Sequence, residues 1–268
     1  MIFLRITSHV LLTLFLTIIS QVGGLVYIIT LLVTQKFKLT VIRSLTSFVI
    51  LYSITSIIVV PLVAPLFGRT AMPIYGDIKP LNLITCILNR HYVQPTLKNQ
   101  LVTISAAMNR EFPGTTIAYL DANFPFFDGF PLFPHLSHND GKKLDLAFFY
   151  VDSESEKQLN SAPSFIGYGI YEGPINNETN YPRICEERGY WQYGALTTLI
   201  PKWYEDDYNV DERRTIALVK YLANHAATSK IFIEPHLKTR WKLTRYDKIR
   251  FHGCHAVRHD DHIHTQIR

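Results

Sequence analysis

Two long stretches without a charged side chain constrain this 268-residue chain more than any other feature of its sequence. The first lies between Arg5 and Lys36, and the second covers residues 44–68. A helix needs ~20 predominantly apolar residues to cross the hydrocarbon core of a bilayer, and both stretches are long enough. Neither stretch has the polar face that is typical of a helix in a soluble domain. The sequence therefore predicts two membrane-spanning helices, at about residues 9–34 and 44–67.

The alternative for the first stretch is a cleaved signal peptide. The apolar core of a signal peptide has ~7–15 residues, and the stretch here is longer and is followed at once by a second one. The short loop between the two stretches carries Lys36, Lys38 and Arg43. Because basic loops are retained on the cytoplasmic side, we expect a cytoplasmic membrane location with the rest of the chain in the periplasm or otherwise outside the cytoplasm. The positions of Arg5 and Arg69 oppose this orientation.

The remainder of the chain has the pattern of a globular domain. Apolar spacing predicts two helices, over residues 96–112 and 211–227, and four strands, over 115–120, 144–151, 231–234 and 262–268. These elements alternate without a parallel rhythm, so the predicted class is α+β, with a small antiparallel sheet flanked by helices and preceded by the two transmembrane helices. The expected organisation is a membrane anchor over 1–69, a linker and helix over 70–114, and a globular domain over 115–268.

The charge of the chain limits the classes of binding partner that we expect. The net charge of +5 suits an anionic partner without selecting one. The basic run 238–250 is typical of a solvated face, and no nucleic-acid-binding module accompanies it, so no nucleic-acid partner is expected.

The three cysteines, Cys86, Cys185 and Cys254, lie far apart and form no C-x-x-C motif. One disulfide could form outside the cytoplasm, and the sequence leaves its pairing open.

The first of two polar clusters runs from His135 to Asp145. Asp145 stands in an apolar strand, where a carboxylate is costly unless it is paired, hydrogen-bonded or bound to a metal. His138 precedes it in a loop, and Gly141 allows a tight turn between the two. A histidine from this loop and an aspartate from the adjoining strand can therefore converge on one ion.

The second cluster runs from His259 to His264. On a strand, His262 and His264 point to the same face, because side chains alternate with a period of two. His259 lies at the strand entrance, where it could act as a base. Zinc accepts imidazole nitrogen and carboxylate oxygen, and a catalytic zinc site uses three protein ligands plus water. The sequence predicts Zn²⁺ on this ground, although buried structural histidines or loose metal binding without catalysis would give the same residue types.

The ordered motifs resemble those of a known superfamily. His138, Gly141 and Asp145 in the pattern H-x-x-G-x-x-x-D, followed by H-x-H at 262–264, are similar to the metallopeptidases named for lysostaphin, D-Ala-D-Ala peptidases and the hedgehog signalling domain. Over residues 115–268 the chain most resembles the penicillin-insensitive murein endopeptidases, through the segments 135–138, 231–235 and 259–264. The resemblance implies zinc ligands at His138, Asp145 and His264, a further candidate ligand at His135, a catalytic base at His259 and a water-orienting group at His262.

The resemblance also implies a function. We expect a membrane-anchored zinc metallopeptidase that hydrolyses the peptide cross-links of bacterial peptidoglycan, with membrane lipid contacted by the two helices. The alternatives are a D,D-carboxypeptidase or dipeptidase acting on free wall peptides, and a noncatalytic zinc-containing protein that binds or senses the wall. Departures from the family pattern leave the substrate open: no arginine motif precedes His138, no second metal pair follows Asp145, and residues 153–190 look like an insertion.

Overall fold

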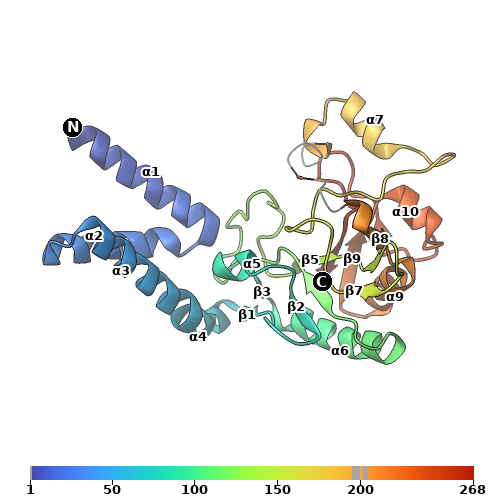
Figure 1. Ribbon diagram of the computed structural model, residues 1–268, viewed down its shortest axis with the longest axis horizontal. Helices are drawn as coiled ribbons and strands as arrows, with labels where there is room; N and C mark the ends of the chain where they lie inside the picture. Colours follow the sequence, from blue (N-terminus) through green and yellow to red (C-terminus); the bar gives the residue numbers. More distant parts are fainter. Residues whose placement is uncertain (1, 195–199, 202–204) are drawn as a thin grey trace. The chain divides into compact units, whose positions relative to one another are not determined.

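The computed structural model describes residues 2–194, 200–201 and 205–268, and the chain divides into two compact units (Figure 1). The first unit consists of three segments: Met1–Ala71, Ile84–Pro95 and Ala122–Gly141. The second unit consists of the other three: Met72–Leu83, Thr96–Asp121 and Lys142–Arg268. Each unit is described by itself below.

Helices dominate the first unit. They are α1 (Ile2–Ser20), α2 (Gly23–Phe37) and α3 (Val41–Ile54), which continues through the π turn η1 (Thr55–Val59), α4 (Val60–Val63) and the 3-10 turn η2 (Ala64–Phe67). The segments Phe3–Ser20 and Val41–Phe67 are long and apolar enough to cross a membrane, and α2 is shorter. The stretch for which the sequence predicts one helix over 9–34 is thus two helices. The backbone breaks at Gln21, where φ is +64°.

Successive apolar helices run in opposite directions, so α2 is antiparallel to both α1 and α3 (Figure 1). Between α1 and α2, the Nδ1 atom of His9 lies 2.7 Å from the hydroxyl of Tyr27. A Cβ atom at Gly24 would lie 2.5 Å from the carbonyl oxygen of Thr13, so only glycine permits this close approach. Between α2 and α3, Thr34 and Ser44 share a hydrogen bond of 2.7 Å.

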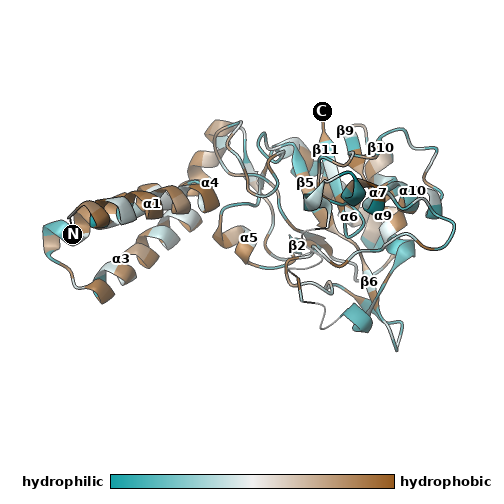
Figure 2. Cartoon of the chain, turned by 90° about the horizontal axis from the view of Figure 1, so that it is seen from above, coloured by the Kyte–Doolittle hydropathy of each residue, from teal (hydrophilic) through white to brown (hydrophobic). Residues whose placement is uncertain are grey.

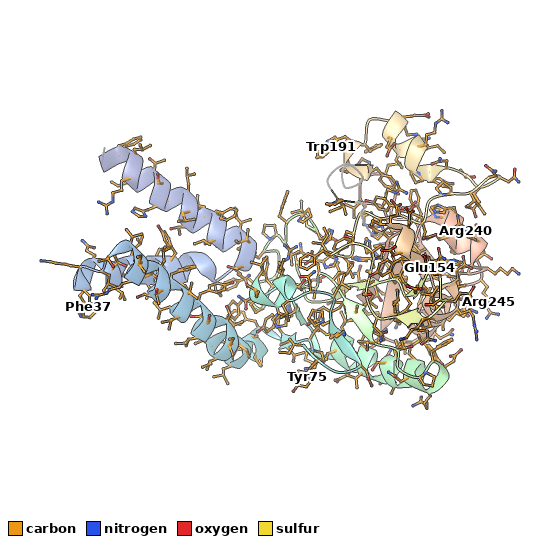
Figure 3. The ribbon with its side chains drawn as sticks, in the orientation of Figure 1. Phe37, Tyr75, Glu154, Trp191, Arg240 and Arg245 are labelled. Atoms are coloured by element: carbon orange, nitrogen blue, oxygen red, sulfur yellow. A yellow bond between two sulfur atoms is a disulfide. The ribbon has the colours of Figure 1, made fainter. Side chains whose placement is uncertain are left out.

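This up-down-up arrangement fixes which residues share an end of the helices. The N-terminus and the turn between α2 and α3 lie at the same end in both views, and Figure 2 shows hydrophilic residues there. Phe37, at the end of α2, points away from the neighbouring helices (Figure 3). Arg5, which the sequence alone places opposite the basic loop, therefore lies at the same end as Lys36 and Lys38.

The other end of the helices carries the remaining segments of the first unit. These are α5 (Ile84–Ile87), the antiparallel pair β1 (Thr70–Ala71) and β3 (Tyr92–Val93), and the loop that ends at Gly141. An apolar cluster joins them, with Val22, Val60, Ala64 and Tyr92 buried in it. Tyr52, Ala71 and Phe126 pack against this cluster.

A six-stranded sheet forms the centre of the second unit, in the order β10-β9-β11-β5-β4-β2. Its strands are β2 (Ile78–Pro80), β4 (Ile117–Tyr119), β5 (Lys143–Ala147), β9 (Thr228–Phe232), β10 (Ile249–Arg250) and β11 (His262–Ile267). β11 is antiparallel to both β5 and β9, whereas β2 and β10 join the edges in parallel. The α+β class is confirmed, but the prediction of one small antiparallel sheet is wrong. The added edge strands have only two or three residues, too few to show a period in the sequence.

The helices of the second unit follow the predicted pattern. The helix expected over 96–112 is α6 (Pro95–Glu111), and the one expected over 211–227 is α9 (Glu212–Asn224). Asp211 caps α9, since its side chain accepts a hydrogen bond of 3.0 Å from the backbone N–H of Arg214. Its described residues also form short helical segments: α7 (Tyr181–Glu187), η3 (Trp191–Tyr193), η4 (Glu205–Asp207) and α10 (Pro235–Arg240).

The strand expected over 144–151 divides into two elements. After β5 the chain leaves the large sheet, and β6 (Tyr150–Asp152) joins a three-stranded sheet with β7 (Gln158–Leu159) and β8 (Tyr208–Val210). The second unit also contains a disulfide between Cys185 and Cys254. The sequence alone leaves the pairing of the three cysteines open, and in the structure Cys86 is not part of the disulfide. This disulfide joins α7 to the loop that precedes β11.

Candidate metal centre

Three of the four residues predicted as metal ligands come together in the structure. His138, Asp145 and His264 are all buried, and each offers one ligand atom within 4.8 Å of the others. Two imidazoles and one carboxylate are a donor set that zinc accepts readily, and they leave a coordination position for water or substrate. The residues can therefore hold a metal ion, and their chemistry fits Zn²⁺.

Strand register brings Asp145 and His264 together. The two residues are directly opposite one another in the antiparallel pair of β5 and β11. Their side chains meet on one face, where the Nδ1 atom of His264 lies 2.8 Å from Oδ1 of Asp145. His262 follows on the same face with period two, and its Nε2 atom lies 3.9 Å from the same carboxylate oxygen.

The carboxylate of Asp145 is held from the other side by Tyr168. The hydroxyl of Tyr168 donates a hydrogen bond of 2.9 Å to Oδ2 of Asp145 and accepts one of 3.2 Å from the backbone N–H of Asp121. The backbone of Asp145 is fixed as well, because its N–H donates to the carbonyl of Asp121 over 2.9 Å. Sequence reasoning missed Tyr168, which lies in a polar loop without any periodic signal.

The orientation of His138 leaves Nε2 as the nitrogen that can ligate. Its Nδ1 atom lies 2.7 Å from the carbonyl oxygen of Ala122, which can only accept a hydrogen bond. Nδ1 therefore carries the proton, an arrangement that is common for histidines that ligate metals. His135 is also buried, with its ring centroid 5.6 Å from that of His138. Among the described residues, however, it is not one of those whose ligand atoms converge.

His259 and His262, the predicted catalytic pair, lie side by side with their ring centroids 4.9 Å apart. Burial, together with the nearby charges of His262 and His264, holds the pKa of His259 well below its ordinary value. Burial also acts to lower the pKa of His262, but the carboxylates of Asp261 and Asp145 outweigh it and raise that pKa overall. The pKa values of the two neighbouring rings are thus shifted in opposite directions by their surroundings.

Asp261 fixes the orientation of His262. Its Oδ1 atom forms a short hydrogen bond with Nδ1 of His262, and its Oδ2 atom accepts one of 2.6 Å from the backbone N–H of Gly169. The neighbouring Asp260 faces another way and pairs with Arg258 through two contacts of 2.9 and 2.6 Å. The two adjacent aspartates of the motif therefore have different partners.

Glu234 supports His259 through the backbone. Its Oε1 atom accepts hydrogen bonds from the hydroxyl of Tyr193 over 2.6 Å and from the N–H of His259 over 3.2 Å. Burial and the nearby charge of Asp260 raise the pKa of Glu234 to about 7. The sequence places Glu234 in a motif but gives it no role.

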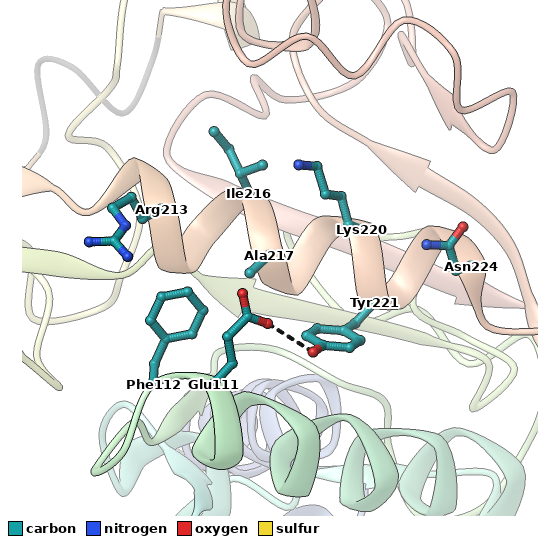
Figure 4. A pocket seen from close by; sticks show the side chains of 8 residues that line it. All are labelled: Glu111, Phe112, Arg213, Ile216, Ala217, Lys220, Tyr221 and Asn224. Atoms are coloured by element: carbon teal, nitrogen blue, oxygen red, sulfur yellow. Dashed lines mark hydrogen bonds between the residues drawn. The ribbon is translucent and has the colours of Figure 1, made fainter.

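A surface pocket elsewhere in the second unit contains none of these residues. It is formed by the end of α6 and one face of α9, where Tyr221 donates a hydrogen bond of 2.8 Å to Glu111 (Figure 4). Its lining includes no histidine or cysteine. The pocket therefore offers no chemistry comparable to that of the buried histidine cluster.

No model of a known protein family matches the chain, and no curated protein matches it either.

Proposed function

We propose that this protein is a membrane-anchored zinc peptidase that hydrolyses peptide cross-links in bacterial peptidoglycan. The observation that carries the proposal is the buried group of His138, Asp145 and His264 beside the pair His259 and His262. A zinc ion that only stabilises a fold is typically held by four protein ligands, whereas three ligands leave one position for water or substrate. Two further histidines with opposite pKa shifts are what a hydrolytic site needs.

The roles follow from the protonation states. Zinc bound to the three ligands would supply Lewis-acid chemistry, polarising the scissile carbonyl and lowering the pKa of water to ~7. His259, neutral because it is buried, accepts the proton of the attacking water. His262, whose protonated form Asp261 favours, donates a hydrogen bond to the negative charge that develops on the carbonyl oxygen. His259 then returns its proton to the leaving amine.

Location outside the cytoplasm is part of the proposal. The disulfide between Cys185 and Cys254 is typical of oxidising compartments. The basic residues Arg5, Lys36 and Lys38 gather at one end of the apolar helices, which favours the cytoplasmic side for that end. An odd number of crossings then leads the chain out of the cytoplasm at residue 69.

A digest tests the activity. The full-length protein, purified in detergent and loaded with zinc, is incubated with cross-linked peptidoglycan, and the products are read by mass spectrometry. We expect conversion of cross-linked dimers to monomers, abolished by chelator and by His138→Ala. The matched control is His255→Ala, because His255 is exposed and outside the cluster.

Other outcomes select other functions. Shortening of free wall peptides with dimers left intact would replace the endopeptidase by a carboxypeptidase or dipeptidase. Stoichiometric zinc binding without turnover of either substrate would indicate a noncatalytic wall-binding protein.

A further inference from the structure

One apolar helix of the first unit, α2, is too short to cross a typical bilayer. With 15 residues and a rise of ~1.5 Å per residue, α2 is about 22 Å long, whereas the hydrocarbon core is ~30 Å thick. Arg5, Lys36 and Lys38 mark where the core stops at one end, since charged side chains avoid hydrocarbon. The hydrocarbon must therefore extend past the turn at Gln21, to the level of the segments packed beyond it.

α5 is one of these segments, and it lies directly against the span Val41–Phe67. The hydroxyl of Tyr52 donates a hydrogen bond of 2.8 Å to the carbonyl of Ile87. The side-chain amide of Asn89 donates to the hydroxyl of Ser56 over 3.1 Å. Polar groups at the end of α5 are thus satisfied by the helix, while the side chain of Ile87 is 57% exposed.

The loop after Ala122 meets the end of the same span. The rings of Phe126 and Phe127 pack on Phe67, with centroid separations of 5.0 and 5.3 Å. The backbone N–H of Phe126 donates a hydrogen bond of 3.1 Å to the side chain of Gln21. Phe127 remains 61% exposed, and Leu66, the residue before Phe67, is 83% exposed. The apolar surface of the helix therefore continues onto the loop.

We propose that α5 and the Phe126–Phe127 turn are inserted into lipid on the side of the membrane opposite the basic loop. Leu66, Ile84, Ile87 and Phe127 form this lipid-contact surface, and all four are exposed in the chain. The occupant is the bilayer that the helices cross, because the surface is continuous with theirs. Polar groups next to this surface have partners, as insertion into lipid requires: the carbonyl of Ile87 and the N–H of Phe126 bond to Tyr52 and Gln21, and the side chain of Asn89 bonds to Ser56.

The lipid-contact surface sets the position of a metal ligand. The N–H of Gly129, two residues after Phe127, donates a hydrogen bond of 2.8 Å to the carbonyl of Asn139, the residue that follows His138. Arg69, which ends the apolar span, is buried in an ion pair with Asp128. His138 is therefore held close to the membrane surface. Under the proposed function, on which this one consequence rests, the substrate is wall peptide that lies against the membrane.

Depth-dependent quenching tests the insertion. Single cysteines replace Ile87 and Phe127 in a Cys86→Ser background of the full chain and are labelled with an NBD fluorophore without reductant, so that the disulfide stays closed. The proteins are reconstituted in vesicles of dioleoyl phosphatidylcholine that contain doxyl-labelled phosphatidylcholine. Leu14→Cys, on α1, is the embedded control, and Glu154→Cys, an exposed polar position labelled in Figure 3, is the water-exposed control.

We expect labels at 87 and 127 to emit at shorter wavelength and to lose more than half of their fluorescence to the doxyl lipid, as at 14 and unlike at 154. The result that overturns the insertion is quenching at 14 without quenching at 87 and 127, whose labels then behave like the one at 154. That result would still support a membrane anchor. A label at 14 that is also unquenched would overturn the membrane anchor itself. Neither result depends on peptidase activity, so failure of the proposed enzyme chemistry remains distinguishable.

Discussion

The hydroxyl of Tyr168 donates a hydrogen bond of 2.9 Å to Oδ2 of Asp145, while Oδ1 of the same carboxylate contacts Nδ1 of His264. A tyrosine from an irregular loop thus orients the only acid among the candidate metal ligands. Second partners of this kind fix the geometry of a ligand, and their loss typically weakens metal binding by ~10–100-fold.

Removing that hydroxyl should weaken zinc binding. Tyr168→Phe keeps the ring and its packing but removes this hydrogen bond to Oδ2 of Asp145, so we expect a loss of ~10-fold in zinc affinity. Competition with a chromophoric chelator measures the affinity directly. Tyr75→Phe is the control, because Tyr75 is 81% exposed. Equal affinities for the two variants would show that Tyr168 does not orient the ligand.

The pH dependence of stability should reveal the protonated carboxyl of Glu234. Its folded-state pKa of about 7 lies above its ordinary value of 4.5, so the folded protein keeps the proton where the unfolded chain releases it. The contribution is fully present below pH 4.5 and is lost as the pH rises through about 7. The shift corresponds to a free energy of the order of 3 kcal/mol.

Glu234→Gln isolates this effect. In zinc-free protein, we expect the melting temperature of the wild type, relative to that of the variant, to fall as the pH rises from 4.5 to about 7. Glu178→Gln serves as the control, because Arg240 lowers the pKa of Glu178 to about 2. The difference in melting temperature between this variant and the wild type should therefore stay constant above about pH 5. A constant difference for Glu234→Gln as well would contradict the protonated state.

Gly141 tests the link between the apolar helices and the loop of His138. Its φ is +74°, and an added Cβ atom would lie 2.5 Å from Cζ of the buried Arg69. Gly129, in the same loop, has a φ of +78° but open space around it. Gly141→Ala should therefore cost about 1–3 kcal/mol more in unfolding free energy than Gly129→Ala, since both share the backbone strain and only one has the clash.

Thermal unfolding and a zinc titration of the two glycine variants provide the measurement. We expect Gly141→Ala to lower both the melting temperature and the zinc affinity, because the displaced Arg69 releases the loop. If the two alanine variants behave alike, Arg69 moves aside freely and the loop is not held by the helix end.

Orientation across the membrane should depend on the basic residues at one end of the helices. Under the proposed orientation, replacing Lys36, Lys38 and Arg43 together by glutamate removes most of the positive charge that retains this end in the cytoplasm. A cysteine at Glu154 should react with an impermeant maleimide added outside intact cells in the otherwise unchanged protein. We expect that labelling to fall in the triple variant. Unchanged labelling would mean that another feature sets the orientation.

Local chemistry was predictable from the sequence, and long-range pairing was not. The isolated Asp145 in an apolar run, and the period-two spacing of His262 and His264, both indicate a metal-type site before any fold is known. That Asp145 stands opposite His264 depends on the register of strands more than a hundred residues apart, which no local pattern encodes. The contact of Tyr168 with Asp145 could not be predicted for the same reason, because the loop of Tyr168 shows no periodicity.

The apolar helices show a second kind of limit. A run of apolar residues predicts a helix but not where the chain reverses, so the sequence over 9–34 does not indicate that this stretch forms two helices. The reversal at Gln21 depends on one residue with positive φ and on the small residues Gly23 and Gly24 that follow it. Glutamine is an unusual choice for such a turn, and its side chain binds the backbone of Phe126.

The position of β11 has a consequence for biosynthesis. Of the strands in the six-stranded sheet it comes last along the chain, yet it lies between β9 and β5. During synthesis, the strands on either side are made first and have no common partner until β11 follows. His264 arrives with that strand, so the two halves of the sheet cannot join, and the candidate metal centre cannot be completed, before β11 is made. The assembly of the metal centre is therefore coupled to the last pairing step of the sheet.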